Sequence, residues 1–128
     1  MIDKVFLGKL ITYIIAQFVE QEGMVSKIRI VKLLYLIDVE HYRMLGRTLT
    51  GLNWIYYKFG PYAFEIEAAL QDISYCLEEE EVLTSRGSTA FVYRTDEVPE
   101  FESEVDYAVQ AMIDRIITRW ATEDTCIL

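Results

Sequence analysis

Few residues in this sequence could support acid–base or nucleophilic chemistry. The only histidine, His41, follows Asp38 by three residues, so the two side chains could share one face of a helix. A histidine oriented by a carboxylate is half of a general-base arrangement. The sequence offers no nucleophile near this pair, no glycine-rich phosphate loop and no strand–turn–helix serine motif. A lone helical histidine beside aromatic residues is more often a packed structural residue, and we expect no enzymatic activity.

The other groups that could bind a metal or form a covalent link are equally sparse. Two cysteines, Cys76 and Cys126, make neither a disulfide framework nor, with one histidine, a zinc site. We therefore expect no metal and no cofactor. No apolar run reaches the roughly 18 residues of a membrane span, and the N-terminus lacks the layout of a secretory signal. These features favour a cytoplasmic protein without a membrane partner.

Charge is distributed unevenly along the chain. Residues 1–60 carry eight basic and five acidic side chains, whereas residues 61–128 carry four basic and sixteen acidic ones. An acidic half repels phosphate backbones within a Debye length of about 8 Å, and it would steer a basic protein partner toward itself. Acidic surfaces also simply keep proteins soluble. Both interpretations fit this half of the chain.

The hydrophobic periodicity predicts the elements that must position these residues. The length of 128 residues suits a single domain, 1–128, and the pattern predicts a compact α+β fold that is mainly helical. We expect helices at residues 5–21, 26–45 and 61–77, and a last helix after a capping box at Ser103 and Asp106. A short strand is expected at residues 52–58 and a β-hairpin at 82–95. Gly60-Pro61 should begin the third helix, and the four glutamates at 78–81 should lie in solvent at its frayed end.

The predicted order of elements is close to that of a winged helix with an extra terminal helix. In that interpretation the third helix would read nucleic acid and the hairpin would be the wing. However, residues 61–77 contain Glu65, Glu67 and Asp72 and no lysine or arginine. A helix that reads a groove needs cations to offset phosphate charge. The charge pattern thus favours a protein partner, with a nucleic-acid-binding regulator as the alternative.

A central block of the sequence combines aromatic, basic and glycine residues at a distinctive spacing. It comprises KLLY at residues 32–35, then Asp38, His41 and Gly46-Arg47, and finally YKFGP at residues 57–61. This layout resembles the Panacea domain of the SocA-like antitoxin family, and the resemblance covers about residues 5–95. Many members continue past the position of Trp120 with a further helical segment, so the resemblance also suggests a C-terminal truncation.

The resemblance implies an antitoxin domain from a prokaryotic or phage toxin–antitoxin pair. Such a domain would neutralise its cognate toxin by direct protein binding. It could also act as a proteolytic adaptor that delivers the toxin to a cytoplasmic AAA+ protease. The resemblance implies no enzymatic activity and no catalytic residue.

We predict that the partner binds at the basic start of the second helix together with the aromatic segment after it. These residues combine cations, aromatic rings and a rigid Gly-Pro corner, which suits a preorganised anchor. A competing interpretation is that Arg47 or Lys58 only pairs with acidic groups of the second half, in an exposed contact of about 0–1 kcal/mol. The acidic surface around Glu65, Glu67 and residues 78–81 would then be the better candidate. The predicted partner-binding residues are Lys27, Arg29, Lys32, Arg47, Tyr57, Lys58 and Tyr62.

Overall fold

Four α-helices and two small antiparallel sheets make up the fold in the computed structural model, which describes residues 3–21, 23–57, 60–99 and 104–120. The fold is α+β and mainly helical, in the predicted winged-helix-like order, which confirms the predicted fold class. The helices are α1 (Lys4–Gln21), α2 (Lys27–Leu45), α3 (Glu65–Asp72) and α4 (Tyr107–Trp120), and a 3-10 turn, η1, spans Ser74–Cys76. The strands are β1 (Val25–Ser26), β2 (Ile55–Tyr57), β3 (Gly60–Tyr62), β4 (Leu77–Leu83) and β5 (Thr89–Thr95).

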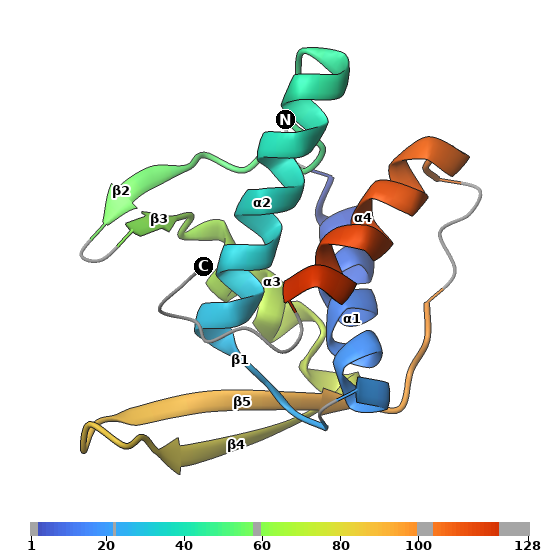
Figure 1. The fold of residues 1–128 in the computed structure, drawn as a ribbon. Coiled ribbons are helices and arrows are strands. Elements are labelled where there is room, and N and C mark those ends of the chain that lie inside the picture. Colours follow the sequence, from blue (N-terminus) through green and yellow to red (C-terminus); the bar gives the residue numbers. More distant parts are fainter. Residues whose placement is uncertain (1–2, 22, 58–59, 100–103, 121–128) are drawn as a thin grey trace.

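The helices α1, α2 and α4 share one hydrophobic core. Helix α1 contacts α2, α3 and β5, and α2 also packs against α4. Ile14, Leu34 and Ile113, one from each of the three helices, are completely buried in this core. Figure 1 shows α4 on one side of α2 and the β2–β3 ribbon on the other. The side of α2 away from α4 is therefore the one that the ribbon covers.

Both ends of α2 lie where the predicted range of 26–45 places them, and each is fixed by a local capping residue. Ser26 has extended backbone angles, and its hydroxyl oxygen accepts a hydrogen bond from the Arg29 amide at 3.2 Å. Such a cap satisfies one of the free amides of the first turn. At the other end Gly46 adopts φ 77°, and its amide donates to the carbonyl of Tyr42 at 2.8 Å. Glycine takes this left-handed conformation without the penalty of a Cβ.

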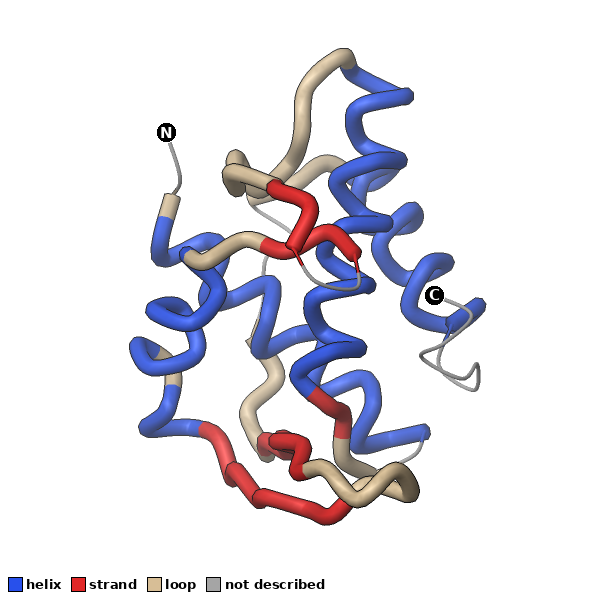
Figure 2. Tube along the Cα trace, turned by 90° about the vertical axis from the view of Figure 1, so that its left-hand side faces the viewer, coloured by secondary structure: helices blue, strands red, loops and turns tan. Residues whose placement is uncertain are grey.

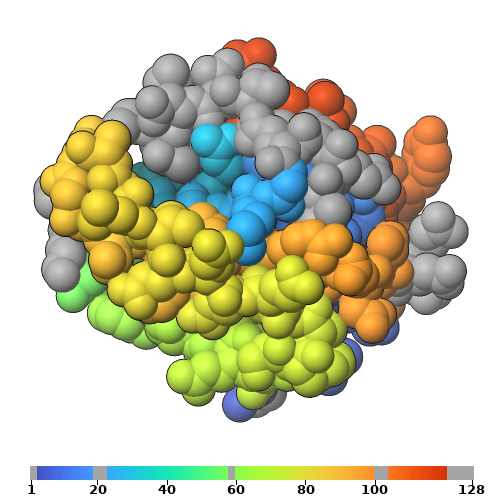
Figure 3. Space-filling model, turned by 90° about the horizontal axis from the view of Figure 1, so that it is seen from below, coloured from blue at the N-terminus to red at the C-terminus, as the bar shows by residue number. Residues whose placement is uncertain are grey.

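The larger sheet has the strand order β1-β5-β4 and lies beneath the helices. The two-residue strand β1 was not predicted, because so short a segment is recognisable only through its pairing with β5, in which Val25 lies opposite Tyr93. Seen from below in Figure 3, the hairpin of β4 and β5 covers much of this face. The predicted hairpin is confirmed, and its loop has Gly87 at φ 81°.

The structure corrects the prediction for the four glutamates at residues 78–81. They do not lie at the frayed end of a helix but form most of β4, which starts at Leu77, five residues before the predicted hairpin. Strand β4 is at the edge of the sheet, and all four glutamates are exposed. Their charges can therefore stay hydrated on either face of the strand. Arg94 on β5 faces Glu78 in the pairing register and contacts its carboxylate at 3.3 Å.

The prediction that Gly60-Pro61 begins the third helix is also wrong. Both residues belong to β3, which pairs with β2 so that Tyr57 lies opposite Gly60 and Tyr56 opposite Pro61. A proline is tolerated here because each strand of a two-stranded ribbon is an edge strand. Helix α3 instead begins at Glu65. The predicted strand at 52–58 is shorter than expected, since only Ile55–Tyr57 pairs and Lys58 lies outside the described residues.

The start of the last helix differs in its capping residue. The Asp106 carboxylate accepts a hydrogen bond from the Val109 amide at 3.0 Å, so Asp106 itself caps α4. Ser103, the predicted cap, lies outside the described residues. None of the helices in the described part of the chain combines the length and apolar character that crossing a membrane requires.

Candidate partner-binding groove

Asp38, on α2, holds the loop that leads from this helix to the β2–β3 ribbon. Its carboxylate is 1% exposed. One oxygen accepts hydrogen bonds from the amides of Leu49 and Thr50 at 2.9 and 3.0 Å. The other accepts from the Thr50 hydroxyl at 2.5 Å and from the indole N–H of Trp54 at 2.8 Å. Four donors thus offset the burial of this charge and fix the loop on the helix.

His41 holds the beginning of the same loop. Its Nδ1 lies 2.6 Å from the carbonyl oxygen of Arg47. Because a carbonyl can only accept, Nδ1 must carry the proton in this contact. No hydrogen bond joins Asp38 to His41 in the described residues, and each side chain binds the loop separately. Asp38 and His41, which resemble half of a general-base arrangement, therefore position the backbone of the loop after α2.

The loop places β2 and β3 against the first turns of α2, and a groove of about 280 Å³ lies between them. In Figure 2, which looks from this side, the two short strands lie in front of α2. The walls are mostly apolar, with two ammonium groups among them. The groove is lined by Lys27, Ile28, Val31, Lys32, Tyr57, Gly60, Pro61 and Tyr62.

Lys27 is held at the edge of the groove by an acidic partner. Its ammonium forms an ion pair with Glu67 of α3 and lies 6.0 Å from the centre of the Tyr62 ring. Burial lowers the pKa of Lys27, and the nearby carboxylate of Glu79 acts in the opposite direction. Lys27 therefore serves partly to join α2 to α3.

Lys32, just over one turn further along α2, has its ammonium against Gly60 of the ribbon. A Cβ at Gly60 would lie 2.5 Å from the Lys32 Nζ, so a larger residue there would push the flexible end of this lysine aside. The φ of 155° at Gly60 is likewise a conformation that other residues rarely adopt. In the described part of the chain, the Lys32 ammonium has neither an ion-pair partner nor a hydrogen-bond acceptor. This arrangement favours the binding of a negatively charged group at the Lys32 ammonium.

Tyr57 and Tyr62 form an aromatic wall of the groove, and the ring of Phe64 packs against both. The rings of Tyr57, Tyr62 and Phe64 lie 5.2–5.9 Å apart, centre to centre, in tilted or edge-to-face arrangements. Pairs in this geometry add about 0.5–1.5 kcal/mol to their area burial. Burial raises the pKa of Tyr62, and Tyr57 adds to the effect. The Tyr62 hydroxyl donates to Glu67 at 3.2 Å, which links this wall to the ion pair of Lys27.

The groove brings together four of the seven predicted residues: Lys27, Lys32, Tyr57 and Tyr62. Arg29 faces the other side of α2, where its guanidinium donates to the Trp120 carbonyl at 2.9 Å and stacks on Phe18 at 5.7 Å. Arg47 follows the far end of α2 and is not among the lining residues. Lys58 lies outside the described residues.

Sequence reasoning missed two residues of this surface. Ile28 lines the groove and is 59% exposed, although its position in a helix of mostly apolar residues assigned it to the core. Phe64 is 56% exposed and supports both tyrosine rings. A signal was available for Ile28: it lies between Lys27 and Arg29, in the basic first turns of the helix.

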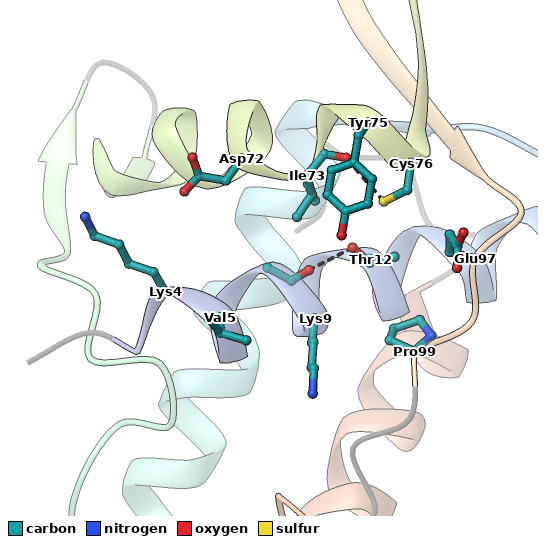
Figure 4. A pocket seen from close by; sticks show the side chains of 11 residues that line it. Lys4, Val5, Lys9, Thr12, Asp72, Ile73, Tyr75, Cys76, Glu97 and Pro99 are labelled. Atoms are coloured by element: carbon teal, nitrogen blue, oxygen red, sulfur yellow. Dashed lines mark hydrogen bonds between the residues drawn. The ribbon is translucent and has the colours of Figure 1, made fainter.

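A larger cavity of about 400 Å³ lies between α1, the end of α3 and the segment after β5. Figure 4 shows that its charged residues come in both signs, with Lys4 and Lys9 on α1 and Asp72 and Glu97 on the neighbouring segments, and that the Lys9 side chain points away from both carboxylates. The thiol of Cys76 donates to the carbonyl of Ile73 at 3.2 Å rather than into open space. None of the predicted partner-binding residues lines this cavity, so the smaller groove is the better candidate site.

Comparison with protein families gives the class of this domain, which is that of the antitoxins. Residues 30–121 match the model described as Antitoxin SocA-like, Panacea domain. The match spans more than half of the chain, and the chain belongs to the SocA-like Panacea family. It includes most of the groove, from Val31 to Tyr62. Searches of curated proteins and of solved structures each found no match.

Proposed function

We propose that this chain is a single antitoxin domain that neutralises a partner toxin in the cytoplasm by binding it through the groove between α2 and the β2–β3 ribbon. The proposal is supported by the family match together with the gathering of Lys32, Tyr57 and Tyr62 around one groove. Tyrosine and other large side chains in preformed pockets dominate protein interfaces. The loop bonds of Asp38 keep this surface preorganised, which lowers the entropy cost of binding.

The domain acts by binding rather than by catalysis in this proposal. Asp38 and His41, the residues best suited to acid–base chemistry, are both buried and both bonded to the loop after α2. Neither lines the groove. Among the described residues that line the groove, the only titratable side chains that a ligand would meet are therefore lysines and tyrosines.

Delivery of the bound toxin to a AAA+ protease is a further step that the domain could perform as an adaptor. The exposed strand β4 does not line the groove and leaves a second surface for such a protease. Occlusion and delivery differ in the lifetime of the toxin. A pulse-chase measurement in cells with and without the protease distinguishes them, because only delivery shortens the toxin's half-life.

Neutralisation is expected to be lost when Lys32→Glu is combined with Tyr57→Ala. The first change reverses the charge of one of the two groove lysines, and the second removes one of the two tyrosine rings that line it. The measurement is growth of cells that co-express the domain with a candidate toxin from a neighbouring gene. The matched control, Lys4→Glu with Tyr75→Ala, makes the same changes in the larger cavity and should still neutralise.

A folded double variant, verified by circular dichroism, that neutralises as well as the unaltered domain would contradict the groove as the binding site. If the double variant unfolds, Lys32→Glu alone decides, since Lys32 is only partly buried and is not a core residue.

Specific binding to duplex DNA is not expected, despite the winged-helix-like order. Helix α3, in the place of a recognition helix, carries Glu65 and Glu67 in its first turn and has no basic residue. The carboxylate of Glu65 accepts a hydrogen bond from the side-chain nitrogen of Asn53 at 2.8 Å, which ties Glu65 to the loop before β2. Fluorescence anisotropy with DNA of the domain's own promoter should give a dissociation constant no lower than the value of about 10⁻⁴–10⁻⁶ M that is typical of non-specific binding. Salt-sensitive binding below that range would favour the regulator instead.

A further inference from the structure

We propose that the groove recognises an acidic–apolar segment of the partner polypeptide, with a carboxylate against the Lys32 ammonium and a large apolar side chain beside it over Ile28 and Tyr57. This inference rests on the proposed function, because it names the chemistry of the partner at the same groove.

The case for a carboxylate comes from the different states of the two lysines. The Lys27 ammonium is already paired with Glu67. The Lys32 ammonium is half-buried against Gly60 and has no acceptor in the described residues. A partly desolvated charge is stabilised when an opposite charge joins it and supplies hydrogen bonds. Lys32 is thus the cation that a bound anion would meet.

The case for an apolar neighbour comes from the walls. Ile28 is 59% exposed and Tyr57 is 42% exposed, and both line the groove beside Lys32. Pro61 and Val31 continue this apolar surface. A carboxylate alone would leave these side chains in water, whereas an apolar side chain next to it would bury them.

The volume and the surrounding charge favour a peptide over a nucleic acid or a larger ligand. The groove of about 280 Å³ is at or below the lower limit of roughly 300 Å³ for sites of drug-sized ligands. It has room for about two side chains. Glu67 and Glu79 lie near Lys27 and would repel successive phosphates of a nucleic acid backbone.

The test measures binding of three short capped peptides to the whole domain by fluorescence anisotropy. The first has the sequence Gly-Ser-Asp-Phe-Ser-Gly, the second replaces its Asp by Asn, and the third replaces its Phe by Ala. We expect the first peptide to bind about tenfold more tightly than the second or the third. The second peptide loses the carboxylate contact and the third loses the apolar contact.

Variants assign the two contacts to their residues. Lys32→Gln should remove the difference between the Asp and Asn peptides and keep the preference for Phe over Ala. Ile28→Ala should remove the preference for the Phe peptide over the Ala peptide and keep the difference between the Asp and Asn peptides. Lys9→Gln, which changes a lysine paired with Glu104 outside the groove, should alter neither preference. Because Ile28 and the Lys32 ammonium are not core groups, all three variants should fold.

Three results would overturn the inference. The first is no saturable binding of the first peptide up to about 1 mM, and the second is equal binding of the Asp and Asn peptides. The third is displacement of the first peptide by inorganic phosphate as effective as displacement by the unlabelled peptide itself, which would reveal an anion site only. Failure of the inference is distinguishable from failure of the proposed function. If peptide discrimination is absent but Lys32→Glu with Tyr57→Ala still abolishes neutralisation, the groove binds toxin by other chemistry. If discrimination is present but that variant neutralises normally, the toxin binds elsewhere.

Discussion

Replacing Asp38 by alanine is expected to lower the free energy of unfolding by about 3–5 kcal/mol. The change leaves four donors without their acceptor: the amides of Leu49 and Thr50, the Thr50 hydroxyl and the Trp54 indole. Thr50 is 4% exposed, so water cannot easily replace the carboxylate there. Urea denaturation followed by circular dichroism measures the loss.

A matched control for this variant is Asp72→Ala, at the exposed end of α3. The Asp72 carboxylate has no hydrogen bond or ion pair with the described residues, so its removal should change stability by less than about 0.5 kcal/mol. The account of Asp38 as the group that holds the loop would be wrong if the two alanine variants were equally stable. The same Asp38 variant should also weaken partner binding, because the loop positions the ribbon.

Leu34→Ala is expected to destabilise the domain by about 2–5 kcal/mol, through lost burial and a residual cavity. Leu34 is completely buried on α2, in the core that this helix shares with α1 and α4. Leu45→Ala, at the end of the same helix and 44% exposed, should cost less than about 1 kcal/mol. Thermal or urea unfolding of the two variants in parallel measures the difference. A loss at position 34 no larger than that at position 45 would contradict this core.

Much of the helical framework could be predicted because its signals are local. The apolar stripe of α1 and the Ser26 and Gly46 boundaries of α2 can all be recognised in short windows of sequence. The buried positions Leu34 and Ile113 follow from the same periodicity. These features depend on neighbours within one helical turn, and the structure confirms them.

The errors fall where a distant or laterally paired segment decides the conformation. Gly60-Pro61 fits the start of a helix locally, but pairing with Tyr56 and Tyr57 makes it a strand. The glutamates of β4 appear unsuited to a strand until Arg94 and the open sheet edge are known. Strand β1 exists only because Tyr93 and Val92 lie alongside it.

The candidate site was predictable in composition more than in geometry. The sequence pointed to lysines at the start of α2 and to tyrosines after Gly46, and the groove contains both. It could not show that Arg29 turns around the helix toward Trp120, because that depends on where α4 packs. The role of Asp38 in the loop was likewise hidden, since Leu49, Thr50 and Trp54 lie 11 to 16 residues away.

The central claim is that the groove between α2 and the β2–β3 ribbon binds the toxin. Isothermal titration calorimetry of the purified domain with an inactivated form of the toxin that it is found to neutralise tests this claim most directly. The account predicts that Lys32→Glu with Tyr57→Ala weakens binding at least about 100-fold, whereas Lys4→Glu with Tyr75→Ala leaves the affinity unchanged. Equal affinity of the folded groove variant and the unaltered domain would contradict it.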